Sequence, residues 1–160
     1  MPCNIFRFSI KCTVKLAFTA MQFLATLSTL ILAAASAYAT TVSYDQTYDN
    51  KSGLLTTVAC SDGPQGLIPH GYNDFGDLPT FPHIGGASAI AGWGSTSCGS
   101  CWHLTYQGKT ITVLAIDHTD DGFNLSLEAM NDLTDGQAEF LGRVDATATQ
   151  VDRSQCGLDF

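Results

Sequence analysis

Residues 98–117 read CGSCWHLTYQGKTITVLAID, and this run carries both the cysteine and the strand signals of the chain. Residues 102–106 and 110–116 are rich in β-branched and aromatic side chains. The segment between them, Gln107-Gly108-Lys109, is typical of a tight turn. The run therefore predicts a β-hairpin that begins directly after a Cys-x-x-Cys pair.

The pair Cys98 and Cys101 has three interpretations. A zinc site needs four ligands, which only Cys60, Cys156 and scattered histidines could complete. A thioredoxin-like redox pair should lie between a strand and a helix, whereas strand residues follow Cys101 here. We favour two structural disulfides, because pairing with distant cysteines closes long loops and stabilises by roughly 3–4 kcal/mol each. The sequence leaves three pairings open.

The front of the chain resembles a secretory leader. Residues 21–39 form an apolar run that ends in Ala37-Tyr38-Ala39, a small-x-small cleavage sequence. We expect residues 1–39 to be a signal peptide that is removed, with Met21 as an alternative start site. An uncleaved anchor helix is the other interpretation, because the apolar run from about Leu16 is long enough to span a membrane.

Cleavage would leave residues 40–160 as one secreted, extracellular domain with no membrane span. Cys3 and Cys12 would leave with the leader, so four cysteines would enter an oxidising compartment, where they can pair. A chain of this length forms one domain with a modest core.

The chain is acidic, with a formal net charge of −8. All 15 acidic residues but only four of the seven basic ones lie after position 40, so the expected mature domain carries −11. This balance argues against nucleic acid, which needs a basic surface, and against anionic membranes and polyanions. An uncharged glycan remains a compatible ligand.

The remaining patterns predict short strands and few helices. Residues 41–44 and 54–59 read as strands around a turn at 49–53, and residues 144–151 read as a final strand. A helix capped by Asn124 or Ser126 would place Leu127, Met130 and Leu133 on one face and end near Gly136. Residues 63–94 are rich in glycine and proline and predict ordered irregular structure. The pattern suggests a small, mainly β barrel with one or two short helices.

Asp117 is the first candidate for a ligand contact, because it ends an apolar strand beside a glycine-rich loop. A lone carboxylate in that position is also often a simple turn former. Glycoside hydrolysis normally needs two carboxyl groups at a fixed separation. No spacing selects a partner among the other candidates, which are Asp45, Asp49, Asp77, Asp120 and Asp121.

Other chemical signatures are weak. The four histidines fall in no recognised Ser-His-Asp frame, and there is no Gly-x-Ser-x-Gly or phosphate-binding glycine loop. Aromatic side chains with polar edges suit sugars, although core packing is their commoner role; they are Tyr44, Tyr48, Tyr72, Trp93 and Trp102. Residues 50–52 and 124–126 are N-glycosylation sequons.

Several longer blocks resemble the cerato-platanin family in the same order along the chain. They cover essentially all of residues 40–160. The blocks are residues 42–45, 48–50, 55–63, 78–86, 92–93, 97–102, 113–117, 122–125 and 151–158, and they include Leu78-Pro79-Thr80-Phe81-Pro82 and Val113-Leu114-Ala115-Ile116-Asp117.

The resemblance implies a fold and a disulfide pattern. Cerato-platanins are small secreted fungal proteins with a six-stranded double-psi β-barrel, similar to expansins and barwin-like domains. Their cysteines pair first with second and third with fourth, which here gives Cys60–Cys98 and Cys101–Cys156.

The resemblance also implies a function. Family members bind chitin oligomers, with cellulose as a further glycan, lie in fungal cell walls or culture fluid, and self-assemble at air–water interfaces. They act on plants as elicitors or phytotoxins, which makes a plant receptor a further expected partner. Some loosen cellulose in an expansin-like manner without clear hydrolysis. No metal or cofactor is expected.

Asp117 resembles the barrel aspartate shared with expansins and related endoglucanases, whose second catalytic carboxylate has no evident counterpart here. We therefore expect non-catalytic binding of chitin or other β-1,4-glycan oligomers, with Asp117, Tyr44, Asp45 and Asn124 as contacts. The alternatives are a weak glycoside hydrolase and a surface-active wall protein whose elicitor role does not depend on these residues. The acids and histidine at 118–121 depart from the family pattern and predict a pH-sensitive rim.

Overall fold

The computed structural model of the chain describes residues 38–160. The predicted signal peptide lies, except for its last two residues, outside the described residues. Tyr38 and Ala39 form the start of the first strand.

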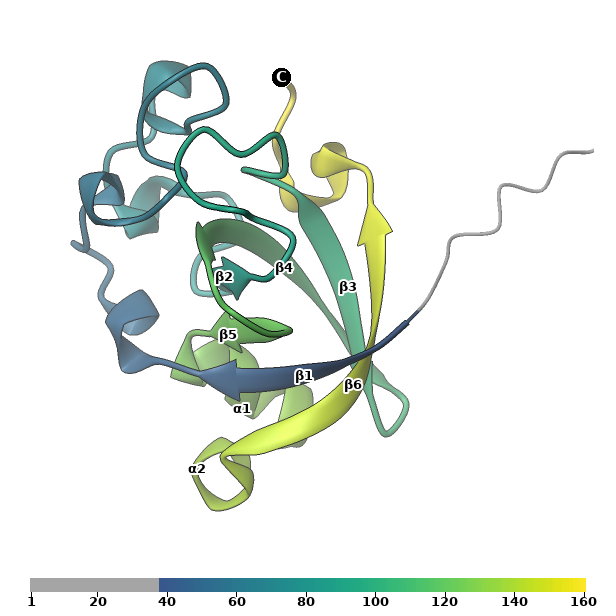
Figure 1. Cartoon of the computed structure of the whole chain (residues 1–160). Helices are drawn as coiled ribbons and strands as arrows, with labels where there is room; N and C mark the ends of the chain where they lie inside the picture. The colour runs from purple at the N-terminus through teal and green to yellow at the C-terminus, as the bar shows by residue number, and fades with distance from the viewer. Residues whose placement is uncertain (1–37) are drawn as a thin grey trace, which may run out of the picture. The chain divides into compact units, whose positions relative to one another are not determined.

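Six strands close into a barrel in the order β1-β5-β2-β4-β3-β6, which confirms the six-stranded barrel (Figure 1). The β1–β5 and β2–β4 pairs are parallel, and the other pairs are antiparallel. The strands are β1 (Tyr38–Tyr44), β2 (Ile84–Ala87), β3 (Cys101–Tyr106), β4 (Lys109–His118), β5 (Phe123–Leu125) and β6 (Arg143–Val151). The predicted hairpin is β3–β4, with Thr105 opposite Thr110.

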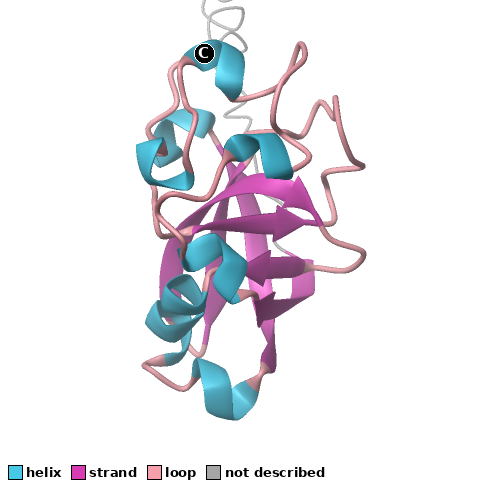
Figure 2. Ribbon diagram, turned by 90° about the vertical axis from the view of Figure 1, so that its left-hand side faces the viewer, coloured by secondary structure: helices cyan, strands magenta, loops and turns pink. Residues whose placement is uncertain are grey.

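The helices are short, as expected, and lie along one side and at the two ends of the strands, whereas loops cover the right-hand side of the view (Figure 2). Helix α1 spans Leu127–Thr134 and α2 spans Ala138–Leu141. Five single 3₁₀ turns complete the fold: η1 (Gln46–Asp49), η2 (Leu55–Thr57), η3 (Ile68–His70), η4 (Phe75–Asp77) and η5 (Arg153–Cys156). Within residues 38–160, no helix has the length and apolar content needed to cross a membrane.

The core lies inside the barrel because the strand pattern alternates. Strand β6 buries Val144, Ala146 and Ala148, and the intervening Asp145 and Thr147 are exposed. Trp102 on β3 is 3% exposed and packs edge-on against Phe123 on β5, with ring centroids 5.3 Å apart. The two aromatic rings thus join opposite parts of the sheet.

Two side chains cap the start of α1. The Ser126 hydroxyl accepts from the Ala129 backbone at 3.0 Å, and the Asp49 carboxylate accepts from Leu127 and Glu128 at 2.8 and 3.0 Å. Ser126 is therefore the cap that the sequence offered, whereas Asn124 belongs to β5. The carboxylate of Asp49 ties the turn η1 to the helix.

The prediction of a strand at residues 54–59 is wrong. Leu55–Thr57 is the 3₁₀ turn η2, and only Leu54 forms an isolated bridge, with Asp74. The Thr57 hydroxyl donates to the Leu54 carbonyl at 2.7 Å, a local bond that competes with strand pairing. The apolar side chains of this segment contribute to the core instead, where Leu55 is fully buried.

The two disulfides are Cys60–Cys98 and Cys101–Cys156, as the family resemblance implied. They exclude the zinc and redox interpretations of the Cys-x-x-Cys pair, because each cysteine is bonded to a distant partner. The bridges close sequence separations of 38 and 55 residues. Cys60–Cys98 joins the β1–β2 loop to the β2–β3 loop, and Cys101–Cys156 ties the end after β6 to β3.

Replacing Cys60 and Cys98 together by alanine should lower the free energy of unfolding by roughly 2–4 kcal/mol, because the unfolded chain regains the freedom of a long loop. Urea unfolding followed by circular dichroism measures this loss. The matched variant lacks Cys101 and Cys156, whose loop is longer, and should lose at least as much. A loss well under about 1 kcal/mol in both variants would contradict the expectation.

Candidate functional site

Asp117 lies at the end of β4, and its carboxylate accepts three hydrogen bonds. Oδ1 accepts from the Ala59 backbone N–H at 2.9 Å and from that of His118 at 2.8 Å. Oδ2 accepts from the Tyr48 hydroxyl at 3.0 Å. The carboxylate thereby joins β4 to η1 and to the segment before Cys60, and a second acceptor position remains on Oδ2.

The sheet register places Asp117 in a row with polar residues of two other strands. Asp117 pairs with Gly86 on β2, Gly86 pairs with Asn124 on β5, and Asn124 pairs with Ser43 on β1. Paired residues project from the same face of a sheet, so Asn124 and Ser43 share one face. The register between β2 and β4 shifts between Gly85 and Gly86, and Asp117 is the β4 residue that pairs directly after this shift. We call Asp117, Gly86, Asn124 and Ser43 the polar row.

Glycine is required on β2 beside the polar row. A Cβ atom on Gly85 would lie 2.2 Å from the Asn124 carbonyl oxygen, which is far inside van der Waals contact. The Gly86 position has no side chain between Asp117 and Asn124. The Ser43 hydroxyl donates to Asn124 Oδ1 at 3.1 Å and so orients the amide. Its NH₂ group stays available as a donor.

The other two predicted contacts lie apart from the polar row. Tyr44 follows Ser43 on β1, so its side chain projects from the opposite face of the sheet. Asp45 follows β1 and caps η1, where its carboxylate accepts from the Thr47 backbone at 2.8 Å. The structure thus brings Asp117 and Asn124 into one row of paired strand residues and gives Asp45 a capping contact.

Tyr48 is a partner of Asp117 that sequence reasoning did not select as a site residue. Tyr48 is 6% exposed, and burial, followed by the charge and hydrogen bond of Asp117, raises the pKa of its hydroxyl above the usual 10. The neutral hydroxyl is therefore held as a donor to Asp117. The available sequence signal was that Tyr48 lies in residues 48–50, one of the blocks that resemble the cerato-platanin family.

His118 borders the polar row and connects it to the loop before β3. Nδ1 lies 2.5 Å from the Ile90 carbonyl oxygen, and Nε2 lies 3.4 Å from Asp120 Oδ1. The Ile90 contact raises the pKa of His118, with smaller support from Asp120 and Asp117. A raised pKa means that this contact favours the folded loop most at acidic pH and weakens as pH rises through the titration.

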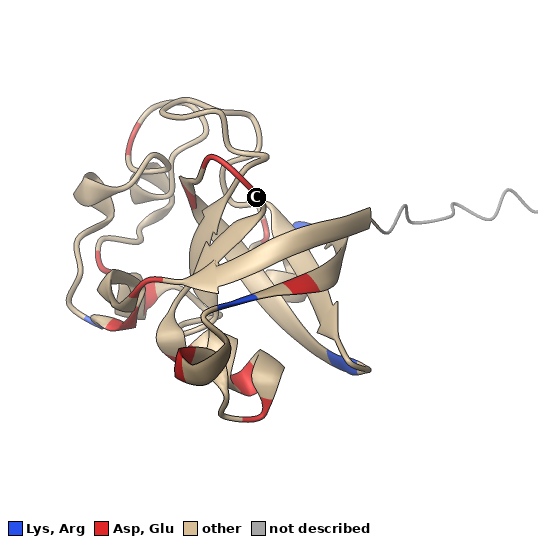
Figure 3. Ribbon diagram, turned by 60° about the horizontal axis from the view of Figure 1, so that its bottom comes forward, with Lys and Arg blue, Asp and Glu red and all other residues tan. Residues whose placement is uncertain are grey.

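One hollow in the described part of the chain lies away from these residues. It has a volume of about 170 Å³ and lies between the β3–β4 turn and the α1–α2 connection, lined by Tyr106, Gln107, Lys109, Leu133, Thr134, Asp135, Gln137 and Leu141. None of the four predicted contacts lines it. Acidic residues are spread over loops, helices and strands (Figure 3). Among residues 38–160 no three His, Cys, Asp or Glu side chains are grouped to hold a metal.

Replacing Tyr48 by phenylalanine should lower the free energy of unfolding near neutral pH by about 1–3 kcal/mol, because Asp117 loses a buried hydrogen bond to a charged acceptor. The wild-type protein should lose stability above about pH 10, where the unfolded tyrosine releases its proton and the folded one retains it.

Urea unfolding at pH 7 and at pH 10.5 measures both effects. Phenylalanine cannot titrate, so the decline between the two pH values should be smaller in the Tyr48→Phe variant. Tyr106→Phe is the control, since the structure gives it no contact with Asp117. Equal declines in the wild type and the Tyr48 variant would contradict the prediction.

Comparison with known proteins gives a consistent result. Residues 40–158 match the family model described as cerato-platanin. The chain is 48% identical over 119 residues to a "Heat-stable 19 kDa antigen" of Coccidioides immitis (strain RS), covering 74% of this chain and 82% of the relative.

Solved structures agree with the sequence comparison. The crystal structure of cerato-platanin 2 from M. perniciosa has a TM-score of 0.73 and 46% identity, covering 76% of this chain and all of that one. The solution structure of the fungal elicitor Cerato-Platanin has a TM-score of 0.66 and 38% identity, covering 72% of this chain and 95% of that one. The chain belongs to the cerato-platanin family.

Proposed function

We propose that this protein is a secreted fungal protein that binds chitin or other β-1,4-glycan oligomers without cleaving them. The observation that carries the proposal is the polar row. It brings a carboxylate, an oriented amide and a hydroxyl to paired positions across adjacent strands of the sheet. Sugar rims offer hydroxyl donors and acceptors at short intervals, and such a row can bond to several of them.

The contacts of Asp117 favour binding over hydrolysis. Three of its four acceptor positions are used by the Ala59 and His118 backbones and by Tyr48. A nucleophile or general acid must be free to form a bond to the sugar or to transfer a proton to it, and it works with a second carboxyl group. We assign Asp117 one bond to a sugar hydroxyl through its remaining Oδ2 position.

Secretion agrees with the covalent structure. Both disulfides close long loops, which is typical of small proteins that fold in oxidising compartments. The chain would then act in the culture fluid or in the fungal cell wall, where chitin and cellulose are available. Expansin-like loosening would follow from competition with contacts between glycan chains.

A second candidate function is surface activity combined with elicitation of plant responses, through a plant receptor and independent of the polar row. Large exposed apolar side chains favour it, among them Phe140 on α2, which is 88% exposed, and Leu54, which is 53% exposed. One solved relative is described as a fungal elicitor. Phytotoxic activity belongs to the same proposal.

The test is a two-dimensional NMR titration of the oxidised protein with N-acetylglucosamine oligomers and, in parallel, with cello-oligomers. Saturable shifts at Asp117, Asn124 and Ser43 for one series would support the binding proposal and identify its glycan. The absence of saturable shifts with either series would overturn it in favour of the surface-active candidate. New reducing ends during long incubation would instead favour a weak hydrolase.

Asp117→Asn is the variant to use, because asparagine keeps one oxygen for Ala59 and His118, whereas alanine would leave buried donors unpaired. We expect this variant to remain folded and to bind glycan oligomers several-fold more weakly, because it loses a charged acceptor. Asp145→Asn on β6 is the matched control, since Asp145 is exposed and outside the polar row. Equal affinities of the two variants would contradict a role for Asp117 in binding.

A further inference from the structure

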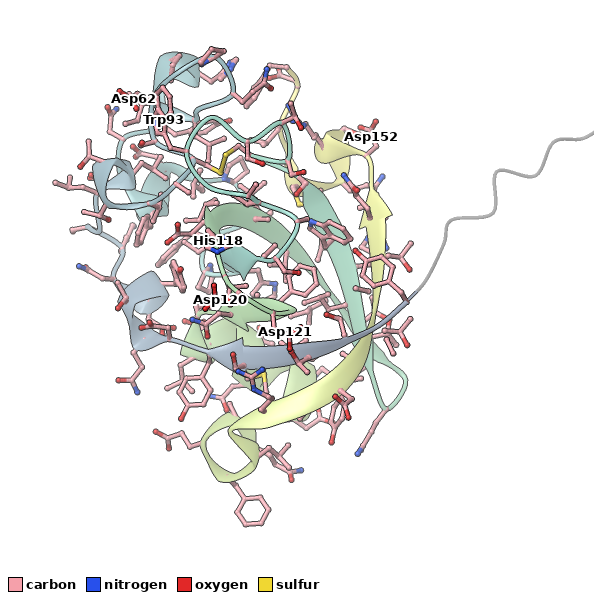
Figure 4. The ribbon with its side chains drawn as sticks, in the orientation of Figure 1. Asp62, Trp93, His118, Asp120, Asp121 and Asp152 are labelled. Carbon is pink, nitrogen blue, oxygen red and sulfur yellow. A yellow bond between two sulfur atoms is a disulfide. The ribbon has the colours of Figure 1, made fainter. Side chains whose placement is uncertain are left out.

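The two tryptophans of the chain have opposite surroundings. Trp102 is 3% exposed inside the barrel, whereas Trp93, in the loop before β3, is 66% exposed. The Trp93 side chain is nevertheless held in place, because its Nε1–H donates to Asp62 Oδ1 at 2.7 Å (Figure 4). The chain thus presents one fixed indole ring to the solvent.

The segments that carry Asp62 and Trp93 are rigidly connected. The Cys60–Cys98 disulfide joins them, two residues before Asp62 and five residues after Trp93. Gly63, at a φ of +83°, lies against the indole, and a Cβ atom there would come within 3.0 Å of Trp93 Cζ2. The Ser95 hydroxyl accepts from the backbones of Ala91 and Ser97 and so closes the turn around Trp93.

The pair combines two kinds of attraction for a cation. The face of an indole ring attracts a positive charge through its quadrupole. The Asp62 carboxylate lies beside the indole nitrogen, accepts also from the Ser61 hydroxyl at 3.2 Å, and uses only Oδ1 for these bonds. Hydrogen bonds from Trp93 foremost lower the pKa of Asp62, so its negative charge persists into acidic conditions.

The shape of the pair also restricts the ligand. An exposed indole provides a flat apolar surface, which suits the C–H face of a pyranose ring. The surrounding protein is acidic, with 15 acidic and four basic residues after position 40, and it therefore attracts cations and repels anions. An amine-bearing sugar fits all three features. Its C–H face can stack on the indole, its ammonium group can bond to the Asp62 carboxylate, and its positive charge is attracted by the acidic protein.

We propose that Trp93 and Asp62 form a binding site for the protonated amino sugars of de-N-acetylated chitin. A glucosamine ring stacks on the indole, and its ammonium group bonds to the free Oδ2 of Asp62. The site differs from the polar row in residues and in ligand charge. It does not depend on chitin binding at Asp117.

The two sites are nevertheless connected through the backbone. Ala59, bonded to Asp117, lies three residues before Asp62, and Ile90, bonded to His118, lies three residues before Trp93. Three residues span at most about 11 Å. One polymer chain with both acetylated and free-amine units could therefore contact the polar row and the Trp93–Asp62 pair at the same time.

Tryptophan fluorescence tests the proposal directly, because Trp102 is buried and a ligand-dependent change reports Trp93. We expect glucosamine oligomers at pH 5 to shift the emission, to saturate, and to protect the protein from acrylamide quenching. Raising the salt concentration should weaken this binding. N-acetylglucosamine oligomers of the same length should give at least a roughly fivefold weaker response, because they lack the charge that meets Asp62.

Asp62→Asn should weaken binding of glucosamine oligomers about fivefold, the factor expected for loss of one charge at contact distance in water. Its remaining oxygen can still accept from Trp93 and keep the ring in place. The control is Asp152→Asn, because Asp152 is also an exposed carboxylate whose pKa is lowered by hydrogen bonds, here from Ser154. This control should bind as the wild type does.

Calorimetry of the Trp93→Ala variant completes the test, with loss of glucosamine-oligomer binding expected and Phe140→Ala as the control exposed aromatic. Equal responses to acetylated and free-amine oligomers, or equal affinities of the Asp62 and Asp152 variants, would overturn the proposal. Chitin-oligomer shifts at the polar row report the other site separately, so failure of either proposal can be recognised by itself.

Discussion

The carboxylate of Asp117 is the contact on which the arrangement of the candidate sites depends. It joins three segments that no strand pairing connects: the end of β4, the turn η1 through Tyr48, and the segment that leads to Cys60. The buried tyrosine supplies a neutral donor and the two backbones supply fixed N–H groups, so the charge is compensated by hydrogen bonds. The barrel end is therefore organised by one anion rather than by apolar packing alone.

The disulfides extend this organisation into the loops. The long segment between β1 and β2 contains only 3₁₀ turns, yet Leu55, Leu67 and Phe75 within it are buried. Cys60–Cys98 fixes this region against the segment before β3, and Cys101–Cys156 fixes η5 against the barrel. A small domain with a modest core gains much of its stability from such bridges, and its loops become rigid enough to present side chains.

Sequence reasoning predicted the elements whose signals are local. The β3–β4 hairpin, β6 and α1 have clear periodicity, turn residues or caps within a few positions. The strands β2 and β5 were missed because they span only four and three residues and exist through pairing with distant strands. Residues 54–59 have the composition of a strand. Leu55 instead packs in the core, and the Ala59 backbone N–H donates to Asp117 rather than to a neighbouring strand. The hydrogen bonds Tyr48–Asp117 and Trp93–Asp62 span 69 and 31 residues, beyond what any spacing rule detects.

Charge and geometry together explain why one small barrel can offer two different glycan contacts. The polar row places its donors and acceptors at paired positions of adjacent strands. The Trp93–Asp62 pair uses an exposed ring and a free charge on a loop, where the disulfide fixes their distance. The backbone segments that carry this pair also contact the end of β4, through Ala59 to Asp117 and through Ile90 to His118. The contacts of the β4 end with Ala59 and Ile90 thus lie three residues before Asp62 and Trp93, respectively.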